Sequence, residues 1–373
     1  MRASHSPADA ILEALRDGQA HSRSALAKAL QLSPSTVSLH VERLISSGML
    51  EELGDGESSG GRKPRMLRIC AGAGQVLAAD LGTRHARLGR FDLTGQLLES
   101  KEIPIEIGKG PQAVWALIEE ELAAWLEDAK GIGVSLPGPV VPETGAVVQP
   151  SRMPGWSGFE SRQYLEEALN LPVAVDNDAN LMALGEHRTR MGKAGDSITV
   201  KAGAAIGSGL ILGGEIHHGA TNAAGDITHT RVQEHGRPCA CGNTGCLETV
   251  ASGVGLVQQL KELGQEVDTT EDVLALIEQA DPQASALVRQ AGGFLGQALS
   301  GVVNFTNPDA VFITGLLSSN EPFLAAVRSR IYENCHPLVT QSLKIEAAAT
   351  GRNAGMTGAA QLVLDSLHQN AAL

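Results

Sequence analysis

Three of the chain's five cysteines, Cys239, Cys241 and Cys246, fall within one short segment, and His229 and His235 precede them closely. Three thiolates and one imidazole complete the tetrahedral ligand set of a structural zinc ion. The glycines between the last two cysteines allow the chain to fold back so that the sulfurs converge. We therefore expect zinc here, against the alternative of three buried thiols in a reducing compartment. The spacing alone leaves either histidine as the fourth ligand.

The segments around these cysteines alternate between short apolar runs and amphipathic helices. Residues 76–103 are typical of a three-stranded antiparallel meander, and helices and strands then alternate almost to the end of the chain. A meander followed by helix, strand and helix occurs about twice. This order favours a two-lobed α/β protein with a cleft.

The first seventy residues predict a helix-turn-helix. A short helix is followed by a second one with Ser22 as its cap, and a third helix starts at Ser33 and Pro34 and ends at Gly48. The third helix carries an apolar stripe at the spacing i, i+4, i+7, i+8. A short helix followed after a turn by a capped, amphipathic one, here the second and third helices of the chain, is typical of DNA-binding domains.

The start of the third helix exposes small polar side chains that could read DNA. The candidates are Ser35, Thr36, Ser38 and Leu39. Short hydroxyls reach base edges or phosphates, and Leu39 could meet a thymine methyl group. The alternative is an ordinary three-helix bundle with solvated serines.

Two strand-like runs, MLEEL and RMLRI, enclose a glycine-rich basic loop and complete a predicted winged domain over residues 1–70. Arg62 and Lys63 lie in this loop, within a basic linker at 54–65. An extended Gly-Arg-Lys-Pro segment fits a narrow, A·T-rich minor groove, whose negative potential attracts arginine. The alternative is a charged linker between domains.

The net charge of −13 is divided unevenly along the chain. Residues 1–69 carry nine basic and eight acidic side chains, whereas the rest carries 20 and 34. An acidic body repels DNA, so DNA contact should come from the N-terminal segment. The sequence predicts no membrane span and no signal peptide, so we expect a cytoplasmic protein without a membrane partner.

A set of motifs along the chain resembles the ROK family of repressors, open reading frames and sugar kinases. In order these are Asp80-Leu-Gly-Thr, GIGVSLPGPV at 131–140, Gly155-Trp156, DNDAN at 176–180, the glycine turn at 203–209, AGDITH at 224–229 and CACGNTGCLE at 239–248. The match covers essentially the whole chain, and the winged domain with its GGRKP segment is similar to the repressor branch.

This resemblance implies an actin/hexokinase-like (ribonuclease H-like) body. We expect a small lobe at 71–185, to which 350–373 returns, and a large lobe at 186–349 that contains the zinc site. The resemblance also selects His229 as the fourth zinc ligand.

The resemblance further implies a set of sugar contacts, which we expect at Gly138, Asn177, Asp178, Asp226, His229 and Glu248. Two departures leave the ligand open: Asp226 stands where the family has glutamate, and Thr228 stands where it has glycine. The shorter carboxylate changes the reach by about 1.5 Å, one C–C bond.

Family kinases use the aspartate at the position of Asp178 as a general base. The three segments that resemble the family's phosphate and nucleotide loops are altered, at 80–85, 203–209 and 314–317. Positioning and electrostatics dominate phosphoryl transfer, so these losses should be disabling. We expect a repressor without enzymatic activity rather than a sugar kinase.

In this repressor a sugar or phosphosugar in the cleft favours a closed form that releases a palindromic operator. We expect a homodimer or a dimer of dimers. Control by a protein partner instead of a sugar stays open.

Overall fold

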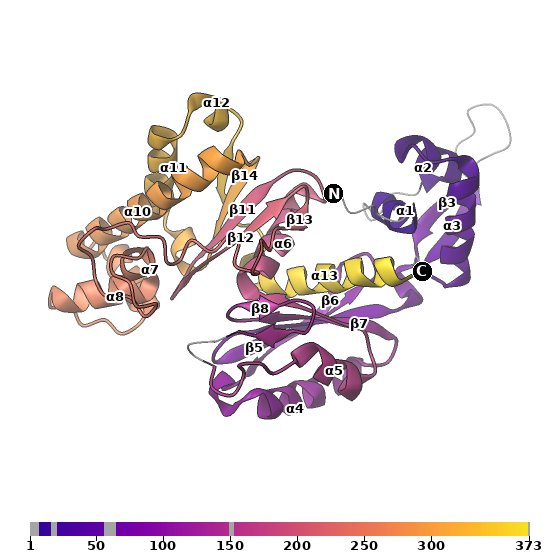
Figure 1. Cartoon of the computed structure of the whole chain (residues 1–373), viewed down its shortest axis with the longest axis horizontal. Helices are drawn as coiled ribbons and strands as arrows, with labels where there is room; N and C mark the ends of the chain where they lie inside the picture. The colour runs from indigo at the N-terminus through magenta and orange to yellow at the C-terminus, as the bar shows by residue number, and fades with distance from the viewer. Residues whose placement is uncertain (1–6, 16–20, 56–64, 149–152, 372–373) are drawn as a thin grey trace. The chain divides into compact units, whose positions relative to one another are not determined.

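The computed structural model describes residues 7–15, 21–55, 65–148 and 153–371, and the chain divides into two compact units (Figure 1). The first unit comprises Met1–Asp178 and Ala359–Leu373, and the second comprises Ala179–Gly358.

The N-terminal helices form the predicted helix-turn-helix and are α1 (Pro7–Leu15), α2 (Arg23–Ala29) and α3 (Pro34–Ser46). Ser22 Oγ accepts a hydrogen bond of 3.1 Å from Ala25 N, and Ser33 Oγ accepts one of 3.1 Å from Thr36 N. These caps satisfy amides that the first turn of a helix leaves without partners. The starts of α2 and α3 therefore follow from the two serines that the sequence analysis singled out.

A three-stranded antiparallel sheet completes the winged domain, with the strand order β1-β3-β2. The strands are β1 (His21–Ser22), β2 (Leu50–Asp55) and β3 (Arg65–Ile69). Leu50, Leu67 and Ile69 are buried, and α1, α2 and α3 contact the sheet. The strands β2 and β3 agree with the two strand-like runs expected from the sequence, whereas the two-residue strand β1 was not expected.

The main sheet of the first unit has five strands in the order β10-β7-β4-β5-β6. They are β4 (Gln75–Leu81), β5 (His85–Asp92), β6 (Leu97–Pro104), β7 (Ala129–Leu136) and β10 (Val173–Asn177). Strands β4, β5 and β6 form the predicted antiparallel meander, and β7 runs parallel to both β4 and β10. The strands β8 (Val140–Val141) and β9 (Ala146–Val147) pair separately.

Helices cover both faces of this sheet. On one face lie α4 (Pro111–Leu122) and α5 (Ser161–Leu169), and Trp115 of α4 packs with Ile132 and Val134 of β7. Alternate strand residues face opposite sides, so Gly133 faces away from α4. There α13 (Ala354–Ala371) passes so close that a Cβ on Gly133 would lie 1.8 Å from Ala359 O.

The second unit is built on a mixed sheet with the order β13-β12-β11-β14-β15. Its strands are β11 (Ser197–Ala202), β12 (Ile206–Leu212), β13 (Glu215–Ile216), β14 (Ala310–Thr314) and β15 (Lys344–Ala347). Its helices are α6 (Asp178–Met191), α7 (Glu248–Ala251), α8 (Gly253–Glu262), α9 (Thr270–Glu278), α10 (Pro282–Thr306), α11 (Glu321–Asn334) and α12 (Pro337–Thr340). The buried faces of α8, α10 and α11 form one apolar core with β11 and β14.

The division between the units differs from the borders expected at 185 and 350. The chain changes units at Asp178, before the body of α6, and again within α13 after Gly358. The reason is the close packing of α6 on the start of α13: a Cβ on Gly358 would lie 1.8 Å from Leu181 O, and one on Gly185 would lie 2.3 Å from Ala354 O. The expected domains at 1–70, 71–185 and 186–349 stay predictions.

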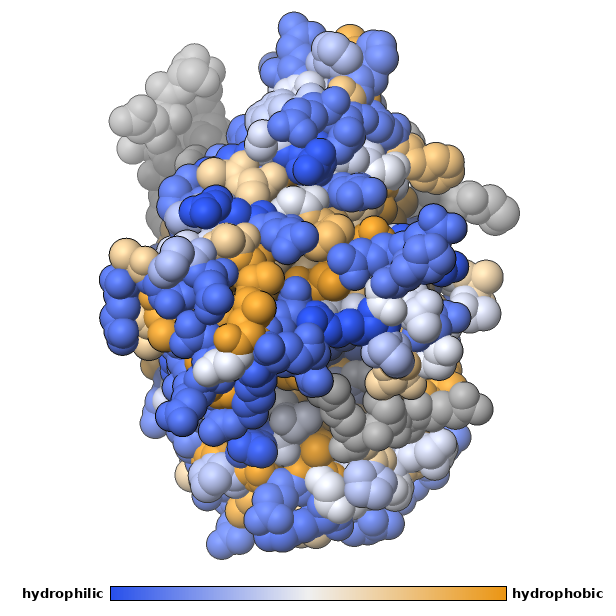
Figure 2. Space-filling view, turned by 90° about the vertical axis from the view of Figure 1, so that its left-hand side faces the viewer, coloured by the Kyte–Doolittle hydropathy of each residue, from blue (hydrophilic) through white to orange (hydrophobic). Residues whose placement is uncertain are grey.

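The molecular surface in Figure 2 is mainly hydrophilic, with hydrophobic side chains in small groups between polar ones. Within the described ranges, no helix combines the length and the apolar character needed to cross a membrane.

Candidate functional site

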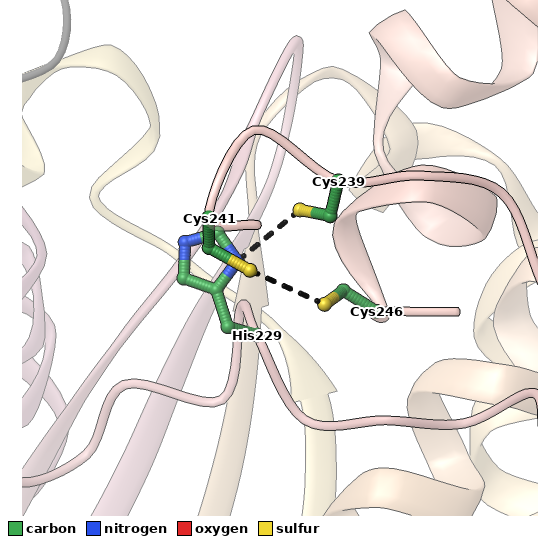
Figure 3. A group of neighbouring side chains, drawn as sticks. All are labelled: His229, Cys239, Cys241 and Cys246. Atoms are coloured by element: carbon green, nitrogen blue, oxygen red, sulfur yellow. Dashed lines mark hydrogen bonds between the residues drawn. The ribbon is translucent and has the colours of Figure 1, made fainter. Parts of the chain in front are cut away.

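The predicted zinc ligands lie together in the second unit. One ligand atom from each of His229, Cys239, Cys241 and Cys246 lies within 4.8 Å of the others (Figure 3). His229 Nδ1 is 3.4 Å from Cys239 Sγ, and Cys241 Sγ is 3.6 Å from Cys246 Sγ. His235 is exposed and does not belong to this group. The structure thus selects the same histidine that the family resemblance selected.

Tight turns bring the sulfurs together. Cys239 N donates to Asn243 O at 2.8 Å, and Gly242 N donates back to Cys239 O at 3.0 Å. Gly242 has a φ of +91° and Gly245 one of +73°, a backbone region that favours glycine. The two glycines therefore allow the reversal of the chain that the CxCxxxxC spacing suggested.

Two of the six ligand-to-ligand distances in the cluster are close to those of a tetrahedral zinc site, and all lie within 4.8 Å. Zinc bonds of 2.3 Å to sulfur and 2.0–2.1 Å to nitrogen give edges of about 3.8 Å between two sulfurs and about 3.6 Å between sulfur and nitrogen. The measured 3.6 Å and 3.4 Å are close to these lengths. The four side chains are a candidate metal-binding cluster.

The sulfurs differ in their electrostatic surroundings. Burial, together with the neighbouring thiols of Cys241 and Cys239, raises the pKa of the Cys246 thiol to about 12. The backbone amide of Asn243 lowers the pKa of the Cys241 thiol. A cation in the cluster would compensate for burying thiolate charge at Cys246.

The second group of candidates, Asp226, His229 and Glu248, lies on either side of the cysteine loop in the same unit. Thr228 N donates to Asp226 Oδ1 at 2.8 Å, and Glu248 N donates to Thr228 O at 3.0 Å. Ile206 joins both segments, because its N donates to Glu248 Oε2 at 2.8 Å and its O accepts from Thr228 Oγ1 at 3.1 Å. The family has glycine at the position of Thr228, so this hydrogen bond from the threonine hydroxyl to Ile206 O is specific to the present sequence.

The two ring nitrogens of His229 lie in different surroundings. Its Nδ1 faces Cys239, and Figure 3 shows the second ring nitrogen pointing away from the sulfurs. Asp226 is exposed, and one of its carboxylate oxygens already accepts the Thr228 amide.

The first unit holds the remaining sugar candidates at the ends of two adjacent parallel strands. Asn177 ends β10 and pairs in register with Leu136 at the end of β7. Asn177 Nδ2 donates to Gly138 O at 2.7 Å and to Asp178 Oδ1 at 3.2 Å. Gly138, Asn177 and Asp178 therefore form one connected group.

Three hydrogen bonds of the segments at 80–85 and 203–209, which resemble the family's phosphate loops, could not be predicted from the sequence. Ser135 Oγ donates to Asp80 Oδ1 at 2.6 Å, which orients the aspartate at the end of β4. In the β11–β12 turn, Gly203 O accepts Gly253 N at 2.7 Å and Ala204 O accepts Val254 N at 3.0 Å. The alternation of strands and turns predicted where these loops lie in the sequence. It could not predict their hydrogen-bond partners, because these are 55 and about 50 residues away along the chain.

The start of α3 presents the predicted DNA-reading residues. Ser35 and Leu39 are exposed, with Leu39 at 49%, and Thr36 and Ser38 are partly exposed. Ser33 Oγ lies 2.8 Å from Ser35 Oγ and 2.7 Å from Thr36 Oγ1. The capping serine therefore orders two of the candidate hydroxyls. Arg62 and Lys63 lie outside the described residues.

A winged helix-turn-helix joined to an α/β body with two five-stranded sheets defines a class of DNA-binding regulators that share a body with sugar kinases. Residues 10–51 match the winged helix-turn-helix DNA-binding domain, and residues 76–366 match the ROK family. The chain belongs to the ROK family.

Relatives of both kinds are similar to it. The xylose repressor of Caldicellulosiruptor bescii is 28% identical over 379 residues, 96% of this chain and 95% of that protein. A glucokinase of Halalkalibacterium halodurans is 31% identical over 311 residues, 77% of this chain and 94% of the enzyme. The crystal structure of a ROK family transcriptional regulator, a homologue of the E. coli MLC protein, superimposes with a TM-score of 0.85 and 26% identity over 98% of both chains.

Proposed function

We propose that this protein is a sugar-responsive transcriptional repressor, which binds a palindromic operator as a dimer and releases it when a sugar or phosphosugar binds. The observation that carries this proposal is the joining of a winged helix-turn-helix to a whole ROK body, an arrangement that matches a ROK transcriptional regulator over 98% of its length. The glucokinase relative covers only 77% of this chain.

The metal in this proposal is a structural zinc ion held by His229, Cys239, Cys241 and Cys246. Four protein ligands leave no open position for a substrate or an activated water. The cluster lies between the Asp226 turn and Glu248, so zinc would stabilise both. Its role is to hold groups in place for ligand binding.

For the sugar we propose hydrogen bonds to Gly138, Asn177, Asp178, Asp226, His229 and Glu248. Carboxylates accept from hydroxyl groups, and the amide of Asn177 donates and accepts. The second nitrogen of His229 is compatible with a sugar hydroxyl while Nδ1 faces the cluster.

The DNA contacts in this proposal are Ser35, Thr36, Ser38 and Leu39 of α3 in a major groove. Arg62 and Lys63 enter a neighbouring minor groove, with a preference for A·T-rich sequence. A repressor acts where the DNA is, so the expected cytoplasmic location belongs to this proposal.

Release of the operator follows from the thermodynamic linkage between sugar binding and DNA binding. If the sugar binds the operator-free form more tightly than the operator-bound form, its binding must weaken operator affinity by the same ratio. Coupling free energies of about 1–3 kcal/mol, or about 5- to 150-fold, are typical of such systems.

A sugar kinase is the second candidate, favoured by the 31% identical glucokinase and by Asp178 at the start of α6. Against it, Thr83 stands at the second glycine of the family's first phosphate loop, and Ala204 and Ala205 lie in the β11–β12 turn. The carbonyls of Gly203 and Ala204 also bond to the first turn of α8. We therefore propose that Asp178 serves as a ligand for a hydroxyl group rather than as a base.

Two assays test these functions together. Selection of bound duplexes from random DNA should recover a palindrome, and D-xylose, D-glucose or glucose 6-phosphate should release it in a dose-dependent way. ATP turnover with the same sugars should stay at background. A protein that selects no sequence, or that phosphorylates a sugar, refutes the repressor proposal. Release by a captured protein partner, with no response to any sugar, refutes the sugar part alone.

A further inference from the structure

Two arginines of the winged domain share one carboxylate. Arg23 Nη2 lies 2.9 Å from Glu52 Oε1, and Arg65 Nη1 lies 2.7 Å from Glu52 Oε2. The three residues come from three elements: Arg23 opens α2, Glu52 lies in β2, and Arg65 opens β3. Each carboxylate oxygen thus has its own guanidinium.

This group lies on the face of the wing sheet that the helices cover. Glu52 pairs in register with Leu67, which is buried in the domain core. Successive residues of a strand point to opposite faces, so Glu51 lies on the other face, where it pairs with Arg68 at 2.6 Å. The chain therefore offers two neighbouring acid–arginine pairings on opposite faces of β2.

Arg23 and Arg65 belong to the parts of the domain that approach the DNA backbone. The first helix of a helix-turn-helix pair, here α2, crosses the backbone beside the groove that the second helix enters. Arg65 follows directly on the basic segment that ends at Pro64. Their side chains are 36% and 66% exposed, so an external anion can reach both.

The carboxylate of Glu52 has the chemistry of the anion that DNA would bring. A phosphodiester presents two free oxygens, as a carboxylate does, and guanidinium groups bind either with paired, charge-assisted hydrogen bonds. The two arginines alone would carry two positive charges, and with Glu52 the group carries one. A phosphate that approaches the arginines must therefore displace or oppose Glu52.

We propose that Arg23 and Arg65 form a phosphate-binding pair for the backbone of duplex DNA, and that Glu52 occupies this pair when DNA is absent. This inference rests on the proposed DNA-binding function and adds contacts to α3 and the wing. Glu52 lowers the affinity for DNA of any sequence. It thereby limits the fraction of protein held at the many non-specific sites of a genome.

Glu52→Gln in the full chain tests the proposal, with Glu51→Gln as the matched control. Both variants remove one negative charge, and exposed ion pairs contribute little to folding, so both should fold. The probe is a fluorescent 30-base-pair duplex of random sequence, titrated between 50 and 200 mM salt. One more phosphate contact adds about −0.9 to the slope of log K against log salt.

We expect Glu52→Gln to bind the random duplex about 3- to 10-fold more tightly at 50 mM salt, with the steeper slope. Glu51→Gln should change the affinity less than about 2-fold, because its charge lies on the opposite face and is screened. With Arg23→Gln and Arg65→Gln also present, Glu52→Gln should have no effect. Arg65→Gln alone should weaken binding and flatten the slope, which keeps the test open if Glu52→Gln does not fold.

Equal effects of Glu52→Gln and Glu51→Gln, or tighter binding that persists without the two arginines, would overturn the proposal. Failure of the proposed function looks different, because the wild-type protein would then bind no duplex at any salt concentration.

Discussion

At the scale of single residues, function depends on which atoms each side chain still has available after folding. His229 directs Nδ1 at Cys239, and its second ring nitrogen points away from the sulfurs. Asp226 gives one oxygen to the Thr228 amide, and Thr228 gives its hydroxyl to Ile206 O. Threonine in place of the family's glycine at position 228 therefore adds a hydrogen bond between this turn and the first residue of β12.

Loss of one sulfur should empty the metal cluster. Cys246 is buried and has Cys241 Sγ at 3.6 Å, so Cys246→Ser removes a central ligand. We expect the wild type to carry about one zinc per chain by elemental analysis. The variant should bind zinc roughly 10- to 100-fold more weakly or worse, and melt at a lower temperature.

Cys335→Ser is the control, because Cys335 is also buried but donates to Ser300 O, a bond that a serine hydroxyl can keep. It should retain the zinc. A wild type that takes up no zinc, or a Cys246→Ser variant with full occupancy, would contradict the assignment.

A buried histidine outside the site should make stability depend on pH. Burial, together with the charge of Arg188, lowers the pKa of His187 from 6.5 to about 4. The unfolded chain therefore binds more protons than the folded one between these two values. Stability should fall as the pH drops from 6.5 towards 4, by roughly 1 kcal/mol per pH unit.

Melting temperatures of the wild type and His187→Gln between pH 4 and 8 check this. The variant can keep a hydrogen bond to Ser197 Oγ, which lies 2.7 Å from His187 Nδ1. The melting temperature of the variant should fall less steeply than that of the wild type as the pH drops from 6.5 towards 4. Parallel curves for the two proteins would assign the acid sensitivity to other groups.

At the scale of helices and strands, short-range signals carried most of what the sequence predicted. Ser22 and Ser33 marked helix starts because a capping hydroxyl needs only the next three residues. The strand β1 was missed because two residues carry no period, and its pairing with β3 depends on Met66 and Leu67 far along the chain. The metal cluster shows the same limit: spacing identified the cysteines, whereas the choice of His229 over His235 needed the fold or a family.

The capping serine of α3 should contribute to both folding and DNA binding. Ser33→Ala removes the bond to Thr36 N and the contacts with the Ser35 and Thr36 hydroxyls. We expect about 1 kcal/mol of lost stability in the winged domain and weaker binding to the selected operator.

Ser46→Ala is the matched control at the other end of α3, since Ser46 Oγ donates only to Glu42 O on the exposed surface. It should change melting and DNA affinity little. Equal behaviour of the two variants would remove the special role of Ser33.

At the scale of the whole molecule, the two units carry different parts of the proposed function. The first unit carries the winged domain together with Asn177 and Asp178, and the second carries the metal cluster, Asp226 and Glu248. The chain passes between the units at Asp178 and again inside α13. A ligand group at Asp178 is therefore covalently adjacent to the point where the units join.

Asp178→Asn should separate sugar sensing from operator binding. The amide keeps a hydrogen-bonding oxygen but loses the charge that a sugar hydroxyl prefers as acceptor. We expect the variant to bind the selected operator as the wild type does. The sugar concentration that releases half of the operator should rise at least 10-fold, about 1.4 kcal/mol. Asp268→Asn serves as the control, because Asp268 is exposed and pairs with the exposed Lys261 at 2.6 Å, so the change should leave release unchanged.

Linkage makes the same experiment quantitative. If the operator-free form binds sugar more tightly by a given factor, saturating operator must weaken sugar binding by that factor in the wild type. Calorimetric titration of the releasing sugar with and without operator duplex measures it. Reciprocity is a thermodynamic necessity, so sugar affinity that does not change with operator, while the sugar still releases DNA, would show that the binding measured by calorimetry is not the binding that releases DNA.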